Sequence, residues 1–136
     1  MGLENIEAIK VVVFWAALNF GVMLFLAINV YRWRAKEGVA VGVGSAVPGL
    51  EKAIRAHGNN IEYVPSILLG LMMLAVLGES VFTLHVAGVT LLLARVLHAV
   101  GIQQNTSRLP PARVLGNILC WGLFLLVIVR LLMLAV

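Results

Sequence analysis

Charge and cysteine are scarce in this sequence. Lysine, arginine, aspartate and glutamate make up 12% of its 136 residues, about half of the ~25% that is typical of soluble domains. The single cysteine, Cys120, lies deep in an apolar run, so it cannot form an internal disulfide. Without a second thiol nearby it makes no metal site. We therefore expect neither a disulfide framework nor a bound metal.

The N-terminus also lacks the positively charged segment that opens a signal peptide. Glu4, Glu7 and Lys10 precede the first apolar run, whereas a secretory leader carries Lys or Arg at this point. We therefore expect the first apolar run to be retained as a membrane helix.

Apolar residues are abundant instead. The sequence is 62% hydrophobic, with a mean hydropathy of +1.04. A soluble domain of this size could not bury so much apolar surface, whereas a bilayer accepts it. The net charge is +4, but the basic residues stand at the ends of apolar runs and form no stripe with aromatic side chains. The composition therefore favours one membrane domain over residues 1–136 and excludes nucleic acid as a partner.

Four apolar runs, at 11–31, 63–78, 81–102 and 114–136, predict four membrane-spanning helices. Crossing the hydrocarbon core takes about 20 residues, so the short second run needs a helix that begins earlier, near Pro48 to Glu51. Backbone groups in lipid must be paired within helices or closed barrels, and no alternating pattern indicates barrel strands. The predicted fold is all-α and integral to the membrane, a bundle of four transmembrane helices over roughly 8–34, 49–78, 81–104 and 111–135.

The distribution of positive charge predicts the orientation. The basic residues cluster in the first and third connections, whereas the second connection holds only Glu79. Cytoplasmic loops carry the excess of Lys and Arg. We therefore expect the first and third connections to face the cytoplasm.

A stripe of polar residues lies on the predicted second helix. Helical spacing brings five polar positions to one face, namely Glu51, Arg55, Asn59, Glu62 and Ser66. Charge at membrane depth is expensive and normally faces the bundle interior or a hydrated cavity. Two interpretations are open: an ion pair of Arg55 or Arg95 with Glu62 that joins helices, or a hydrated pocket for a charged ligand.

The third apolar run adds polar groups of its own. Arg95 and His98 are three residues apart, so they share a helix face. Arg32 at the end of the first helix and Arg113 at the start of the fourth add cations at the same depth. This is more polarity than helix association requires, and it favours a positively weighted cavity suited to a ligand with several carboxylates.

Three segments of the sequence resemble a known family. The eleven residues Arg55 to Pro65, RAHGNNIEYVP, closely resemble the signature of the MAPEG family, the membrane-associated proteins in eicosanoid and glutathione metabolism. The segment Arg95 to Gly101, RVLHAVG, is similar to the family's third-helix motif, and Arg32-Trp33-Arg34 to its basic pair after the first helix. The resemblance covers essentially the whole chain and is closest to the microsomal type of glutathione S-transferase.

The resemblance implies a homotrimer of four-helix subunits, with glutathione bound as co-substrate between neighbours. It implies glutathione contacts at Arg55, Asn59, Glu62 and Tyr63, with Arg32 and His57 as further ones. To these we add Arg95 and His98, the polar residues of the third apolar run. It places the arginine that activates the thiol at the start of the fourth helix, where we prefer Arg113 over Arg108. Ile102 stands where eicosanoid-forming members often have tyrosine, which argues against leukotriene or prostaglandin formation.

The resulting functional hypothesis is a membrane-bound glutathione transferase that conjugates lipophilic electrophiles from the bilayer and also reduces lipid hydroperoxides. Two alternatives remain open. One is a non-catalytic lipid-binding or scaffold protein on the same fold, and the other is a small four-helix transporter that uses Glu62 as a coupling carboxylate. The expected location is a bacterial inner membrane, or the endoplasmic reticulum if the source is eukaryotic.

Overall fold

The structure, a computed structural model, describes residues 3–42, 46–106 and 108–136. Four helices follow one another along the chain: α1 (Leu3–Glu37), α2 (Pro48–Val76), α3 (Val81–Gln103) and α4 (Pro111–Ala135). Each helix is long and apolar enough to cross a membrane. The protein is therefore an all-α, multi-pass membrane protein, as the apolar runs predicted.

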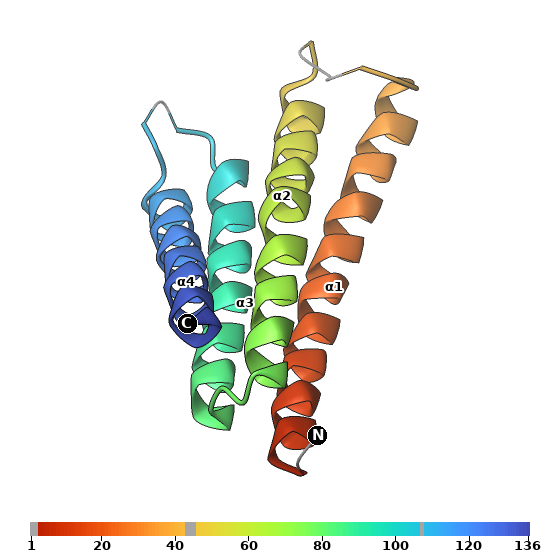
Figure 1. Cartoon of the computed structure of the whole chain (residues 1–136). Coiled ribbons are helices and arrows are strands. Elements are labelled where there is room, and N and C mark those ends of the chain that lie inside the picture. Colours follow the sequence, from red (N-terminus) through yellow and green to blue (C-terminus); the bar gives the residue numbers. More distant parts are fainter. Residues whose placement is uncertain (1–2, 43–45, 107) are drawn as a thin grey trace.

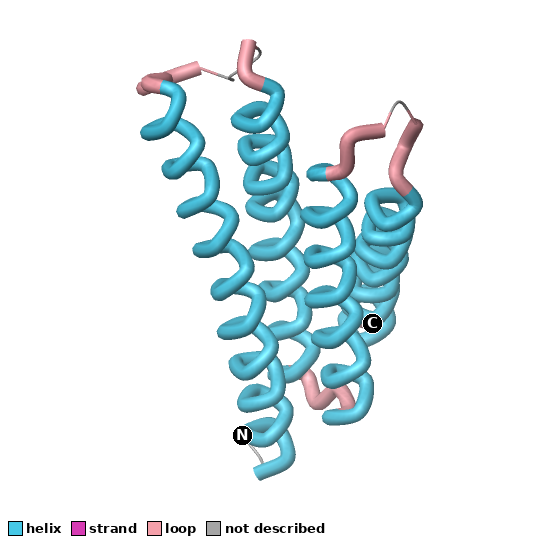
Figure 2. Tube along the Cα trace, turned by 180° about the vertical axis from the view of Figure 1, so that it is seen from behind, coloured by secondary structure: helices cyan, strands magenta, loops and turns pink. Residues whose placement is uncertain are grey.

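The helices form an antiparallel bundle in which neighbours along the chain lie side by side (Figure 1). The N-terminus and the short α2–α3 turn lie at one end, which we call the turn end. The two longer connections lie at the opposite, loop end, where α1 and α2 project beyond α3 and α4 (Figure 2). In the described residues α2 contacts each of the other three helices, whereas α1 does not contact α4.

The helix ends follow local sequence chemistry. α1 extends beyond the predicted range 8–34 at both ends, with Glu4 in its first turn and Arg34 and Lys36 in its last, where these charges favour the helix dipole. α2 stops at Val76 rather than at 78, because the turn uses Gly78 at φ +88°. At the start of α3, the Ser80 side chain accepts a hydrogen bond from the Thr83 backbone N–H.

Proline fixes the start of two helices. Pro48 begins α2, so the segment that carries the polar stripe is helical although it precedes the apolar run. Pro110 is the N-cap of α4 and Pro111 its first residue, which places Arg113 in the first turn. Both starts lie at the loop end, so they bring the polar segments of α2 and α4 to the same end of the bundle.

The apolar core fills the turn-end half of the bundle. Its fully buried members include Val12 of α1, Leu71 and Leu74 of α2, and Leu84 and Leu91 of α3. In the loop-end half, the described residues form a much smaller apolar cluster of Leu26, Ala56 and Ile102, and Leu50 and Ala53 are also buried there. One half of the bundle is therefore closely packed, and the other has room for polar side chains.

The outer faces of the helices are apolar. Large side chains stand exposed along the bundle, such as Phe25 at 66% and Leu132 at 63% of full exposure. A soluble monomer rarely exposes apolar surface on this scale. These faces are suited to contact with lipid chains or with other membrane helices.

Candidate functional site

Two adjoining cavities open at the loop end, between α2, α3 and α4. The inner cavity has a volume of about 410 Å³ and is lined by Glu51, Ile54, Arg55, Gly58, Asn59, Glu62, His98, Ile102 and Arg113. The outer cavity has a volume of about 550 Å³ and adds residues of the third connection, namely Gln104, Thr106, Arg108, Leu109 and Pro110, together with Lys52 and Gly101. Glu51, Arg55, Ile102 and Arg113 line both, so the two form one continuous site.

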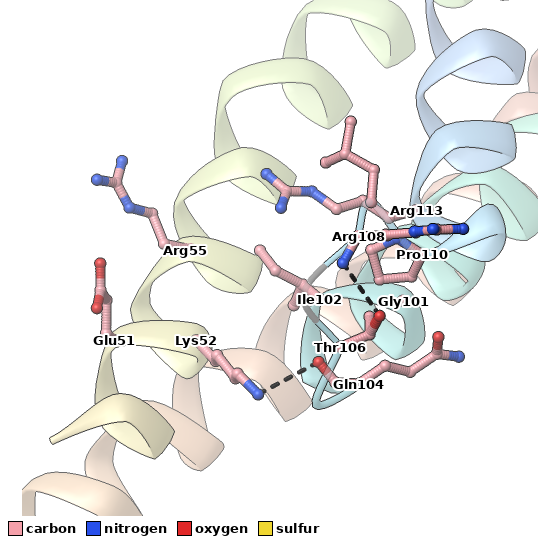
Figure 3. A pocket seen from close by; sticks show the side chains of 11 residues that line it. Glu51, Lys52, Arg55, Gly101, Ile102, Gln104, Thr106, Arg108, Pro110 and Arg113 are labelled. Carbon is pink, nitrogen blue, oxygen red and sulfur yellow. Dashed lines mark hydrogen bonds between the residues drawn. The ribbon is translucent and has the colours of Figure 1, made fainter.

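The site has an excess of positive charge. Its basic side chains come from three elements: Lys52 and Arg55 from α2, Arg108 from the third connection and Arg113 from α4 (Figure 3). Glu51 and Glu62 are its acidic side chains among the described residues. Four cations facing two carboxylates would attract a ligand that carries more negative than positive charge.

Close packing of α3 against α4 sets the position of Arg113. A Cβ atom at Gly101 would collide with the Arg113 backbone, and one at Gly116 would lie 2.6 Å from the carbonyl oxygen of Ala94. Both positions require glycine because the two backbones approach so closely, as small residues allow in membrane helices. These glycines were not among the predicted site residues, since glycine in an apolar helix gives no polar signal.

Lys52 holds the third connection in place. Its Nζ donates to the backbone oxygen of Gln104 at 3.3 Å (Figure 3). It also donates to the backbone oxygen of Gln103 at 3.3 Å and to the side chain of Asn105. The first turn of α2 is thus bound to the C-terminal end of α3, where backbone carbonyls lack helical partners. Sequence reasoning missed this residue, because its partners lie about fifty residues further along the chain and two of them are backbone oxygens.

The ion-pair interpretation of the polar stripe is wrong for the described residues. Glu62 is exposed and pairs with neither Arg55 nor Arg95 among the ion pairs of the structure. Arg95 instead donates from Nη1 to Asn59 Oδ1 at 2.7 Å and from Nη2 to the backbone oxygen of Gly116 at 3.4 Å. Four residues of the stripe, all except Ser66, therefore line the inner cavity, and Glu62 forms no ion pair among the described residues.

Five of the predicted site residues line the inner cavity, namely Arg55, Asn59, Glu62, His98 and Arg113. Arg108 lines the outer cavity alone.

The remaining four, Arg32, His57, Tyr63 and Arg95, line neither cavity in the described structure. Arg95 is only 2% exposed and lies within the bundle. Tyr63 accepts a hydrogen bond from Trp121 Nε1 at 3.3 Å, and its ring lies 5.5 Å from the Arg95 guanidinium. The prediction that Arg95 faces a ligand is corrected on this point, because Arg95 lines neither cavity and its Nη1 and Nη2 groups are bound to α2 and α4. Its buried Nε has no partner in the described structure.

Arg32 lies in a separate pocket on α1. This pocket has a volume of about 370 Å³ and is lined by Asn29, Arg32, Trp33 and Lys36. The neighbouring Arg34 is used within its own chain segment, donating to the backbone oxygens of Val39 and Gly42. Within one subunit the structure does not join Arg32 to the cavity that Arg55 lines.

Comparison with known proteins identifies the family. The family model of the MAPEG family matches residues 12–133. The chain belongs to the MAPEG family. Two relatives are the proteins named inner membrane protein YecN in Escherichia coli K12 and in Escherichia coli O6:H1, each 30% identical over 94 residues, which is 69% of this chain and 71% of the relative. No solved structure matches the chain. The polar α2 segment and the third-helix motif that line the cavity both lie inside the MAPEG match.

Proposed function

We propose that this MAPEG protein is a glutathione transferase that binds glutathione in the loop-end cavity and conjugates it to lipophilic electrophiles. The observation that carries the proposal is the inner cavity, where Arg55, Glu62 and Arg113 meet at the end of a membrane bundle. Charged side chains at this depth are costly unless they serve a ligand or a pathway.

The charges of the cavity match those of glutathione. The tripeptide carries two carboxylates and one ammonium group, and the site offers arginines with two acidic side chains. Arginine is suited to carboxylates because its paired donors match the two oxygens. Arg55 would hold a carboxylate, and Glu62, which forms no ion pair among the described residues, would hold the ammonium.

Arg113 is the better candidate for thiol activation. It lines both cavities, whereas Arg108 lines only the outer one. The first turn of α4 also presents unpaired backbone N–H groups and the positive end of the helix dipole. A guanidinium at this place favours the thiolate over the thiol, because the charge and the hydrogen bond stabilise the ionised form.

The reaction follows from this arrangement. The thiol proton leaves to water in the cavity, and the thiolate attacks the electrophilic carbon. A sulfur–carbon bond forms while the leaving group, such as a halide, departs with its bonding electrons. With a lipid hydroperoxide, two glutathione molecules supply two electrons, and the products are an alcohol, water and glutathione disulfide. The apolar substrate reaches the site sideways from the lipid that contacts the exposed helix faces.

We also propose that three copies assemble into a homotrimer with the loop end in the cytoplasm of a bacterial cell. A neighbouring subunit would bring its Arg32 to the cavity, which lacks it within one chain. The YecN relatives are named inner membrane proteins, which supports this location. The clustering of basic residues at the loop end supports the orientation.

The test is turnover of purified protein in nanodiscs with glutathione and a chromogenic aryl halide. Arg113→Ala should lower turnover about ten- to a hundredfold, as expected when one charge-assisted hydrogen bond to a thiolate is lost. Arg108→Ala, at the rim of the outer cavity, should lower turnover less than Arg113→Ala, and the reverse order would assign thiol activation to Arg108. The absence of turnover with aryl halides and with hydroperoxides would refute the proposal, and lipid binding without glutathione binding would favour the scaffold alternative.

A further inference from the structure

Arg95 is the largest side chain that is fully buried in the bundle. It lies in α3, and its hydrogen bonds reach Asn59 of α2 and the backbone of Gly116 in α4. Its guanidinium also lies 5.5 Å from the ring of Tyr63, within the range of a cation–π contact. No carboxylate pairs with it among the described residues.

The bond to Arg95 determines which way the Asn59 amide points. Arginine carries only donors, so the atom that faces it at 2.7 Å must be the acceptor oxygen of the amide. The Nδ2 group of Asn59 is then directed away from Arg95. Asn59 also lines the inner cavity, and no hydrogen bond among the described residues uses its Nδ2 group, which leaves this donor for a ligand in our proposal.

This orientation of the Asn59 amide explains why the residue is an asparagine, although an aspartate would pair more strongly with Arg95. An aspartate at this position would form a buried ion pair with Arg95, which is otherwise a buried charge without a carboxylate. An aspartate, however, has no hydrogen to donate and would repel a ligand carboxylate. An asparagine accepts a hydrogen bond from Arg95 Nη1 with its oxygen and can offer a donor to an anion with its nitrogen.

We infer that Arg95 is a positioning residue that fixes Asn59 as a hydrogen-bond donor for an anionic group of the ligand. The assignment of that group to a carboxylate of glutathione rests on the proposed function. Arg95 itself does not touch the ligand, because it is 2% exposed and lines neither cavity.

The first experiment compares Asn59→Asp with Asn60→Asp. Asn60 is the adjacent residue, 2% exposed, and its Oδ1 has no partner in the described structure. Asn59→Asp should melt at or above the temperature of the wild type, because the new carboxylate faces Arg95. Asn60→Asp should melt lower, because it buries a carboxylate without a partner. If Asn59→Asp is destabilised as strongly as Asn60→Asp, the pairing with Arg95 is refuted.

The same Asn59→Asp protein tests whether residue 59 donates a hydrogen bond to the ligand. The measurement is isothermal titration calorimetry with glutathione. We expect affinity to fall about ten- to a hundredfold, as for the loss of a hydrogen bond to a charged group. If the Asn59 oxygen instead accepted from a ligand N–H, the aspartate would preserve or tighten binding. Retained affinity in a stable Asn59→Asp protein would therefore overturn the inference.

A double-mutant cycle separates positioning from general structural support. Arg95→Met should weaken glutathione binding in the wild type, because the Asn59 amide is then free to turn. In the Asn59→Ala background the same change should have little further effect on affinity. Equal losses in both backgrounds would show that Arg95 acts only through the fold and would refute its positioning role.

Failure of the proposed function would give a different pattern. If the wild type binds no glutathione, the melting comparison of Asn59→Asp with Asn60→Asp still tests the Arg95–Asn59 pairing. Glutarate, a simple dicarboxylate, then replaces glutathione as the probe for the donor. Glutarate binding that Asn59→Asp abolishes would support the inference without the transferase, and no binding of either anion would refute the donor role.

Discussion

Replacement of Gly116 by alanine tests the close packing that positions the site. Gly116 lies in α4, where a Cβ atom would be 2.6 Å from the Ala94 carbonyl oxygen and 2.8 Å from the His98 backbone nitrogen. Both atoms belong to the α3 backbone, which cannot rotate away as a flexible side chain could. Gly116→Ala therefore has to push the two helices apart.

The magnitude follows from two opposing effects. Overpacking of a close contact costs about 1–3 kcal/mol, whereas glycine to alanine in a helix gains up to about 1 kcal/mol. Gly122, also in α4, has no atom within 4 Å of the position that a Cβ would take. Gly122→Ala should therefore gain the helix propensity of alanine without any cost of overpacking. The propensity effect cancels in the comparison, and the two variants should differ by about 1–3 kcal/mol in free energy of unfolding.

The assay is thermal or denaturant unfolding of both variants in the same detergent. Gly116→Ala should unfold first, and Gly122→Ala should match or exceed the wild type. Because Gly116 also accepts a hydrogen bond from Arg95 through its carbonyl oxygen, separation of the helices should weaken glutathione binding as well. Equal stability of the two alanine variants would refute the argument that α3 and α4 touch through this glycine.

Three further changes address other contacts. At the turn end, burial alone would raise the pKa of Glu79, but hydrogen bonds from Arg130 and the Ser80 backbone N–H outweigh it and lower the pKa. Glu79→Gln should therefore lower the melting temperature at pH 7, and this difference should shrink below pH 4.5, the ordinary value, as acid protonates the carboxylate; a difference that grows in acid would contradict this. Lys52→Met should free the third connection and speed tryptic cleavage after Arg108, whereas Lys36→Met, at an exposed lysine of α1, should not; equal cleavage would refute the anchoring role. Glu62→Gln should weaken glutathione binding about tenfold through the ammonium contact without lowering the melting temperature, because Glu62 is exposed and forms no ion pair among the described residues; an unchanged affinity would remove Glu62 from the site.

The sequence was sufficient for the membrane class, the number of helices and most of the polar face. Runs of apolar residues as long as the bilayer is thick allow little choice but helices. The stripe of Glu51, Arg55, Asn59, Glu62 and Ser66 could be predicted because helical spacing alone puts these positions on one face. All of them except Ser66 line the inner cavity.

Which polar side chain meets which partner was decided by the tertiary structure. Arg95 and His98 share a helix face in the sequence, yet His98 lines the cavity while Arg95 is turned to Asn59 and Gly116. Spacing along one helix gives a direction, but not how near the next helix lies in that direction. That distance depends on the glycines between α3 and α4 and on the lysine that joins α2 to the third connection, and both act on backbone atoms, whose positions no residue pattern specifies. The sequence by itself determined a charged membrane bundle, and packing decided which of its charges face a ligand and which hold the site in shape.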